Sequence, residues 1–215
     1  IPDDSEFQTV FKNHLIFLLR SKWKTGEPGD LMSLSPKGEI QVVAKAGGAG
    51  TILRADWNQD AIYVVRMENV ANQIERVVLN GNQWMTEKIV LPVLGSADLA
   101  ALSAFEANVL FEYEDYLTPP SLFLAEDGIK PVKIKSKAER FKSKGLTVRQ
   151  FWATSRDGVQ IPYFLITNPD RKGPQPTLLY GYGGFEVPLV PYYFDVLGKF
   201  WLEKGGTYAV ANIRG

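Results

Sequence analysis

The sequence predicts a mainly β protein, with a partial β-propeller of about three antiparallel blades followed by the first part of an α/β domain. Three observations support this prediction. Short apolar segments recur at an even spacing over the first two-thirds of the chain, turn residues separate them, and the last third changes to a strand–loop–helix–strand order. Repeats of about four strands are typical of propeller blades, whereas strands that alternate with helices are typical of α/β domains.

The repeat is carried by three apolar segments that begin at residues 15, 62 and 109, so that successive starts are 47 residues apart. A second and a weaker third strand follow each one, which predicts strands at 15–19, 31–34, 40–43, 62–65, 74–79, 88–91, 109–113, 121–124 and 132–134. β-Branched and aromatic runs bounded by Gly, Asn, Asp and Pro are strand signals. An antiparallel sandwich with accidentally even spacing is the alternative. Because closed propellers have about four to eight blades, three blades indicate an arc of a larger ring.

A polar, basic stretch at residues 135–147 separates the two predicted parts. Such a run is typical of a solvated connection, and an interaction patch is the alternative. We therefore assign residues 1–138 to the C-terminal blades of a propeller. Residues 139–215 are assigned to the beginning of an incomplete α/β domain.

The predicted α/β part begins with a hairpin, in which residues 146–155 and 161–167 flank the turn Arg156-Asp157-Gly158. A strand at 176–181, a glycine-rich loop, a helix and a strand at 207–213 follow. The helix is predicted because apolar residues share one helical face, at Tyr193, Val196, Leu197, Phe200 and Trp201. Gly205-Gly206 is expected to end this helix.

Composition excludes several classes of function. The 24 basic and 24 acidic residues balance, without the basic surface expected of a nucleic-acid-binding protein. The absence of cysteine excludes disulfides and thiolate metal sites. Neither a secretory leader nor a run of about 20 apolar residues is visible, so no membrane association is expected. The compartment stays open between cytoplasm and periplasm, and no cofactor is expected.

The loop Tyr180-Gly181-Tyr182-Gly183-Gly184-Phe185 carries the chemistry. In α/β-hydrolases, the loop after the third strand supplies part of the oxyanion hole. Glycines let the backbone approach a substrate closely, and the Tyr182 hydroxyl could donate to a developing alkoxide, a contribution of ~3–4 kcal/mol. Phosphate binding and a simple turn are the alternatives for such a loop.

The wider sequence resembles the prolyl oligopeptidase family of serine peptidases. Pro-Thr-Leu-Leu-Tyr-Gly-Tyr-Gly-Gly-Phe at 176–185 and Gly-Thr-Tyr-Ala-Val-Ala-Asn-Ile-Arg-Gly at 206–215 resemble the start of its catalytic domain. Residues 155–162 are similar to an early hairpin of that domain, and residues 111–119 to the last propeller blade. The resemblance covers most of the chain from about residue 60 and is most specific at the glycine loop.

This resemblance implies a seven-bladed propeller that caps an α/β-hydrolase domain, and hydrolysis of short peptides on the carboxyl side of proline. It implies that Tyr182 donates to the oxyanion, with Gly183 and Gly184 beside the substrate. Phe185 would line the pocket for the proline ring, and core packing is its alternative role. Basic-specific relatives tend to carry serine and tyrosine where Gly184 and Phe185 stand here, which favours the proline-type pocket.

The sequence contains no G-x-S-x-G nucleophile elbow. In α/β-hydrolases the catalytic Ser, Asp or Glu, and His follow in that order. The single histidine, His14, lies on a predicted blade strand and is expected to pack there, while Ser155 and Asp157 lie in a hairpin turn. The triad is therefore expected beyond residue 215, and the chain alone is expected to be inactive. A non-catalytic propeller and hydrolase-like module that binds peptides is the alternative.

Two further expectations concern metals and association. Asp3-Asp4 and the Glu112, Glu114 and Asp115 group are interpreted as solvated charges, and no metal is expected. Open sheet edges favour pairing with another chain, so the isolated fragment is expected to self-associate.

Overall fold

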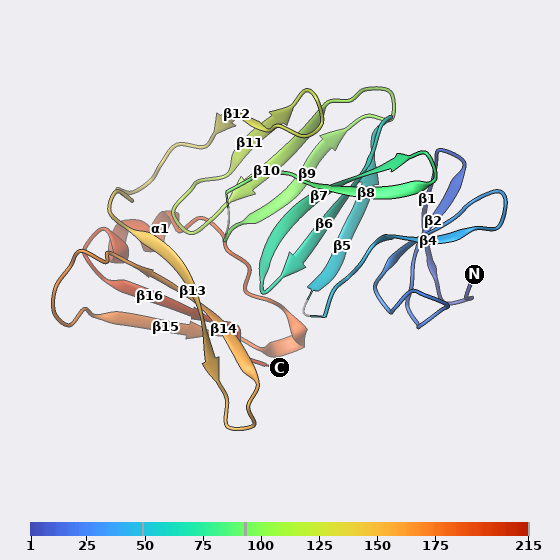
Figure 1. Cartoon of the computed structure of the whole chain (residues 1–215). Coiled ribbons are helices and arrows are strands. Elements are labelled where there is room, and N and C mark those ends of the chain that lie inside the picture. The colour runs from blue at the N-terminus through green and yellow to red at the C-terminus, as the bar shows by residue number, and fades with distance from the viewer. Residues whose placement is uncertain (49, 93, 215) are drawn as a thin grey trace. The chain divides into compact units, whose positions relative to one another are not determined.

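The computed structural model describes residues 1–48, 50–92 and 94–214, and Figure 1 shows its elements in order. Within these ranges, the strands form four sheets of four strands each. The prediction of a mainly β protein is confirmed. The last residue of the predicted α/β domain, Gly215, lies outside the described residues.

The first three sheets follow one another along the chain, and each contains four consecutive strands. Their members are β1 (Glu6–Phe11), β2 (His14–Leu18), β3 (Leu31–Leu34) and β4 (Ile40–Ala44); β5 (Gly50–Trp57), β6 (Ile62–Glu68), β7 (Ala71–Asn80) and β8 (Gln83–Lys88); β9 (Ser96–Leu102), β10 (Val109–Glu114), β11 (Ser121–Ala125) and β12 (Val132–Ser136). Neighbouring strands are antiparallel throughout the first two sheets. This arrangement matches the predicted blades.

The predicted repeat found the middle strands and missed the first strand of each sheet. The starts at 15, 62 and 109 fall on β2, β6 and β10, whereas β1, β5 and β9 precede them. In β5, charged and polar side chains interrupt the apolar pattern because the strand lies at the edge of its sheet. The strand predicted at 88–91 was wrong. A two-residue turn at Gly81-Asn82 pairs Asn80 with Gln83, so β8 already begins at Gln83. It ends at Lys88, where the predicted strand was expected to begin.

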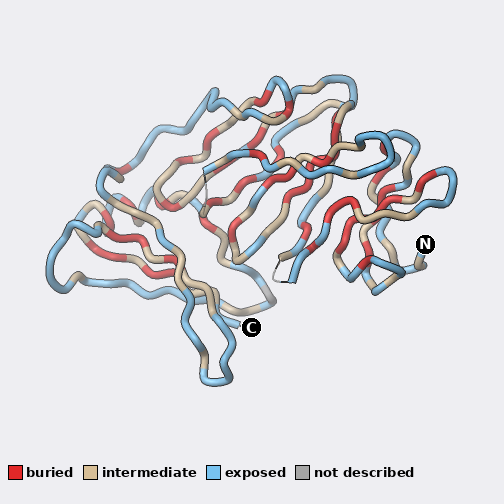
Figure 2. The backbone as a smooth tube through the Cα atoms, in the orientation of Figure 1, coloured by how far each residue is buried: buried red, intermediate tan, exposed pale blue. Residues whose placement is uncertain are grey.

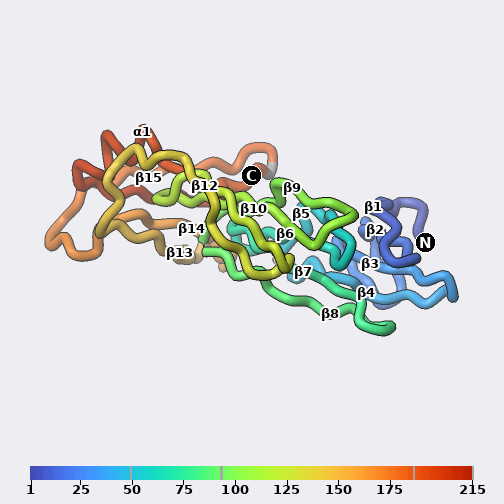
Figure 3. Tube along the Cα trace, turned by 90° about the horizontal axis from the view of Figure 1, so that it is seen from above, coloured from blue at the N-terminus to red at the C-terminus, as the bar shows by residue number. Residues whose placement is uncertain are grey.

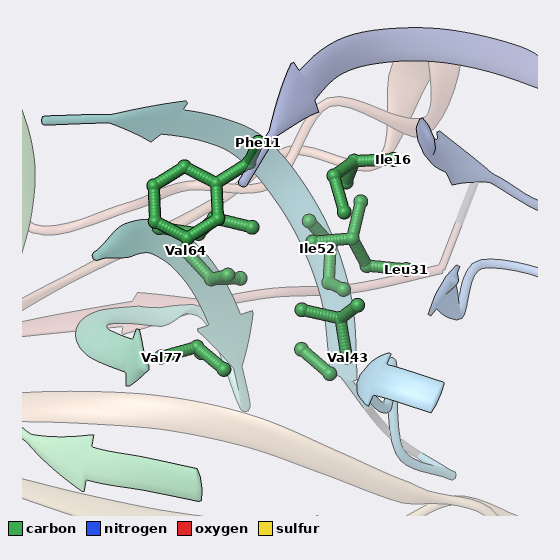
Figure 4. Packing of buried hydrophobic residues seen from close by; sticks show 9 residues of the cluster. Phe11, Ile16, Leu31, Val43, Ile52, Val64 and Val77 are labelled. Atoms are coloured by element: carbon green, nitrogen blue, oxygen red, sulfur yellow. The ribbon is translucent and has the colours of Figure 1, made fainter. Parts of the chain in front are cut away.

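A shared apolar core joins the first two sheets. Both contribute side chains that are at most 9% exposed, and Figure 4 shows Phe11, Ile16, Leu31, Val43, Ile52, Val64 and Val77. Burial of each such side chain contributes about 1.5–3 kcal/mol relative to exposure, which explains why the sheets pack face to face. Along the tube in Figure 2, most buried residues lie within strands, whereas β12 is exposed along its whole length.

Contacts group the chain into two compact units. Unit 1 contains Ile1–Leu91, Ala97–Phe111 and Phe123–Val132, and unit 2 contains Pro92–Ser96, Glu112–Leu122 and Lys133–Gly215. Segments of the third sheet thus belong to both units. The boundary predicted after residue 138 stays a prediction.

Unit 2 contains the fourth sheet, in the order β13-β14-β16-β15, and Figure 3 gives a second view of these strands. The strands are β13 (Thr147–Thr154), β14 (Gln160–Thr167), β15 (Thr177–Gly181) and β16 (Thr207–Ala211). β13 and β14 form the predicted hairpin, closed by hydrogen bonds between Ser155 and Val159 and between Gly158 and Ser155. β15 and β16 are parallel, so a crossover connects them.

The crossover differs from the predicted helix. It contains the 3₁₀ turn η1 (Gly184–Glu186), α1 (Asp195–Leu197) and the π-helical η2 (Gly198–Leu202). Val196 and Phe200, predicted on the buried face, are 64% and 73% exposed. The buried face carries Gly198 and Leu202 instead, because the Phe141 ring packs so close to Gly198 that a Cβ there would lie 2.2 Å from it. None of the helices in the described ranges is long and apolar enough to cross a bilayer.

Candidate active site

The candidate site lies where the parallel strands β15 and β16 end. Their register pairs Gly181 with Ala211, so residues 182–185 and 212–214 both leave the sheet at the carboxyl ends of these two strands. In open α/β sheets, ligands bind outside the carboxyl ends of the strands. The position of the glycine loop is therefore that of a ligand-binding loop.

Tyr182 folds back over Gly184. A Cβ built on Gly184 would lie 2.6 Å from the Tyr182 hydroxyl oxygen, a distance that real Cβ atoms do not show. Only glycine at position 184 therefore permits this orientation of the phenol ring. Tyr182 is 39% exposed, so it lies in a position that a ligand can reach.

Gly183 lies against the backbone that follows β16. A Cβ at this position would lie 2.4 Å from the carbonyl oxygen of Arg214 and 2.8 Å from that of Ile213. Both obstacles are main-chain atoms, which cannot rotate away as a side chain can. The residues after β16 thus form a floor beneath the glycine loop.

Phe185 combines backbone strain with exposure. Its φ and ψ are 58° and 25°, in the left-handed region that few bulky residues adopt. Its side chain is 93% exposed, although burying a phenylalanine is favourable by about 1.5–3 kcal/mol. Strained residues that persist at ligand-binding sites often serve the function of the site.

Asn212 connects the residues after β16 to the crossover. Its side-chain oxygen accepts a hydrogen bond from Leu189 N at 2.7 Å, and its amide group donates to Leu189 O at 3.4 Å. Its backbone N–H donates to the carbonyl of Pro162 on β14 at 3.1 Å. Asn212 therefore links the segment after β16 both to the crossover and to β14.

An aromatic cluster fixes the later part of the crossover. The ring of Phe194 lies 4.7 Å from that of Tyr116 and 5.1 Å from that of Tyr208, and Phe194 N donates to Tyr116 O at 3.3 Å. Burial raises the pKa of Tyr116, so its hydroxyl stays protonated. This packing belongs to the scaffold of unit 2.

Arg214 also contacts the β13–β14 hairpin. Its guanidinium donates to Asp157 Oδ2 at 2.7 Å and to Ser155 Oγ at 3.5 Å, and the Ser155 hydroxyl donates to Asp157. The hydrogen bonds from Arg214 and then from Ser155 hold the pKa of Asp157 well below its usual value. Ser155 and Asp157 therefore interact with each other and with an arginine, and not in a catalytic triad.

Three other residues considered from sequence, His14, Glu114 and Asp115, have structural partners. His14 Nδ1 lies 2.9 Å from Lys12 O, and the His14 ring meets Trp84 edge-on. Glu114 accepts from Tyr193 N, while Asp115 accepts from the N–H groups of Leu117 and Thr118. Over the described part of the chain, no group of three or more His, Cys, Asp or Glu could hold a metal ion.

Sequence reasoning selected Tyr182, Gly183, Gly184 and Phe185, which are consecutive and lie together in one loop. It missed Asn212 and Arg214, which support that loop. Their sequence signal is that they follow an apolar strand within the family-like segment 206–215, which by itself gives them no particular role. That signal becomes informative once β16 is known to run parallel to β15.

No family model matches the chain, but individual relatives do. An uncharacterized peptidase of Sinorhizobium fredii, y4nA, is 34% identical over the whole of this chain, which covers 32% of that protein. A prolyl endopeptidase of Elizabethkingia meningoseptica is 33% identical over 71% of this chain and 22% of its own length.

Solved structures agree with these sequence relatives. A post-proline cleaving enzyme from Rickettsia typhi matches all of this chain with a TM-score of 0.80 and 28% identity, over 33% of that enzyme. The chain thus spans about a third of the length of the curated relatives that it matches over its whole length.

Replacing Gly183 is expected to lower the stability of the protein, whereas replacing Gly184 is expected mainly to change the orientation of the Tyr182 side chain. Gly183→Ala should destabilise the protein by about 1–3 kcal/mol, because overpacking against backbone must be relieved by backbone shifts. Gly184→Ala should cost less, because the obstacle is the end of the Tyr182 side chain, which can rotate. The midpoint of urea unfolding measures both effects.

Gly48→Ala is the matched control, because a Cβ there would meet nothing within 4 Å. Its effect should stay within about 0.5 kcal/mol. Equal unfolding midpoints for Gly183→Ala and Gly48→Ala would contradict the packing described for the loop.

Proposed function

Because the chain belongs to the prolyl oligopeptidase family, we propose that it is part of a serine-type oligopeptidase that cleaves short peptides, on the carboxyl side of proline. The observation that carries this proposal is the glycine loop at the carboxyl end of β15, with the Tyr182 hydroxyl held over Gly184. The fourth sheet is then the beginning of an α/β-hydrolase domain, in residues 139–215. Residues 1–138 are then the last blades of a propeller that limits entry to short peptides.

The proposed mechanism assigns one transition-state interaction to this chain. A serine beyond residue 215 attacks the peptide carbonyl, and a histidine acts first as base and then as acid. Tyr182 donates its hydroxyl to the oxyanion, together with a backbone N–H beside the nucleophile. Such a donor accelerates the reaction because it acts on charge that develops only in the transition state. The chain alone, without nucleophile and base, does not turn over substrate.

Phe185 is proposed as the wall of the pocket for the proline ring. Its exposed aromatic face offers apolar contact to a ring that has no N–H donor. Gly183 and Gly184 are proposed to face the substrate through their backbone, since the space on their Cβ side holds the Arg214 carbonyl and the Tyr182 hydroxyl. Binding would also bury a phenylalanine that is 93% exposed in this chain.

A non-catalytic peptide-binding module with the same fold is the second candidate. The exposed Phe185 and the open loop edge would serve binding as well as catalysis. The sequence that follows residue 215 discriminates the two functions. A G-x-S-x-G elbow within roughly the next hundred residues favours the enzyme, since α/β-hydrolases place the nucleophile on such a turn.

Removal of the Tyr182 hydroxyl tests the proposed mechanism. In the full-length protein, Tyr182→Phe should lower the acylation rate constant roughly 100-fold to 1,000-fold, the loss typical of one oxyanion donor, with KM nearly unchanged. Tyr163→Phe removes a phenolic hydroxyl from β14 and serves as control. Single-turnover kinetics on a proline peptide measure the rate, and an unchanged rate in Tyr182→Phe would exclude the assigned role.

A panel of chromogenic peptides tests the substrate class. Peptides with proline, arginine or acetylated alanine at the cleavage site should show the highest kcat/KM for proline. Phe185→Ala should lower kcat/KM for the proline peptide by about tenfold or more, because lost apolar contact in a pocket weakens discrimination. Faster cleavage of the arginine or the acetylated alanine peptide would assign this chain to a basic-specific or acyl-peptide-cleaving relative.

The isolated chain is proposed to self-associate through β15. This strand lies at the edge of its sheet and exposes Leu178, Leu179 and Tyr180, of which Leu179 is 75% exposed. Unpaired edge strands are templates for pairing with another chain, and an edge lysine prevents such pairing. Size-exclusion chromatography with light scattering should show oligomers, fewer of them in Leu179→Lys. A clean monomer at micromolar concentration would refute this expectation.

A further inference from the structure

Arg214 links two parts of unit 2 that are far apart in sequence. Its guanidinium donates to Asp157, 57 residues earlier in the chain, and to Ser155 in the same hairpin turn. We call Arg214, Asp157 and Ser155 the Arg214 bridge. Arginine suits this position because its planar fork can donate to two acceptors at once.

The backbone of Arg214 supports the glycine loop. Its carbonyl oxygen lies so close to Gly183 that a Cβ there would be 2.4 Å away, and Gly183 directly follows Tyr182. A displacement of Arg214 would therefore move the floor of the loop or leave a gap beneath it. Interactions that hold the Arg214 side chain act on the loop through this one residue.

The strength of the bridge decides which property it affects. The side chains of Arg214 and Asp157 are each 54% exposed, and exposed ion pairs contribute little to stability. Catalysis is more sensitive to geometry, because a misplacement of about 1 Å can cost roughly 100-fold in rate. An exposed pair in contact with a catalytic loop therefore matters for position more than for stability.

We propose that Asp157 is a positioning residue for Tyr182: through Arg214, it holds the backbone on which the glycine loop rests. This inference rests on the proposed function, because it needs Tyr182 to act on the oxyanion. In the described part of the chain, the hydrogen-bond partners of the Asp157 carboxylate are Ser155, Val159 N and Arg214, none of which belongs to the glycine loop. The effect of Asp157 is transmitted by the Arg214 side chain, the Arg214 carbonyl and Gly183.

The Asp157 carboxylate of the Arg214 bridge is ionised at neutral pH. The hydrogen bonds from Arg214 and Ser155 lower the pKa of Asp157, and arginine stays protonated in proteins. A depressed carboxyl pKa means that the pair is present above the ordinary aspartate pKa and is lost only when pH falls through the lowered value. Substitution is therefore a better probe of the bridge than pH.

The test is a double-mutant cycle in the full-length protein. Asp157→Ala should lower the single-turnover acylation rate constant by roughly tenfold with KM nearly unchanged, within the range of an ångström-scale misplacement. In the Tyr182→Phe background, Asp157→Ala should have almost no further effect, because the donor that it positions is already absent. Asp157→Glu, which keeps the carboxylate, should recover most of the rate.

Asp170→Ala is the matched control. Asp170 is exposed in the turn between β14 and β15, and its substitution should leave the rate unchanged. Hydrogen exchange of the backbone amides of residues 183–185 gives a readout that is independent of activity. Exchange should accelerate in Asp157→Ala, but not in Asp170→Ala, while the urea midpoint of both variants stays near that of the parent protein.

The outcomes separate this inference from the proposed function. If Tyr182→Phe itself leaves the rate unchanged, the catalytic role of Tyr182 fails, and the positioning role of Asp157 fails with it. If Tyr182→Phe is slow but Asp157→Ala lowers the rate equally in both backgrounds, only the positioning role fails. Unchanged rate or unchanged amide exchange in Asp157→Ala would also overturn it.

Discussion

The parallel pairing of β15 with β16 is the constraint on which the candidate site depends. Because Gly181 pairs with Ala211, the loop that begins at Tyr182 and the segment that begins at Asn212 leave the sheet together. An antiparallel pairing would send these two segments to opposite edges. The contact between Gly183 and the Arg214 carbonyl and the position of Asn212 beside the crossover both follow from this register.

Sequence periodicity predicted the fold class and the middle strands, because apolar residues dominate those strands. In β6, the four residues from Ile62 to Val65 are all buried. Edge strands such as β5 were missed because their solvent-exposed positions carry polar residues, which interrupt the apolar pattern of the strand. The helix was mispredicted for a tertiary reason. Its apolar residues suggested one buried face, whereas the Phe141 ring selected the face that carries Gly198.

The candidate site was only partly predictable. Glycine and aromatic residues carry local information about backbone freedom and ligand contact, so Tyr182, Gly183, Gly184 and Phe185 were identified from residue type and family resemblance. Asp157 reads locally as an ordinary turn aspartate. Its contact with Arg214 depends on the sheet order β13-β14-β16-β15, which no local pattern specifies. The contacts of these supporting residues could therefore not be predicted until the strand order was known.

The backbone of residues 213–214 beneath Gly183 limits how the glycine loop could be transferred to another protein. The six-residue sequence from Tyr180 to Phe185 is short enough to transplant into another scaffold, but its Gly183 packs against the backbone of Ile213 and Arg214. A graft of the loop alone would lack that counterpart and relax into some other turn. The smallest piece that could be transferred is thus the paired ends of β15 and β16 with the segments that follow them. An insertion in either segment would disturb the packing of the other.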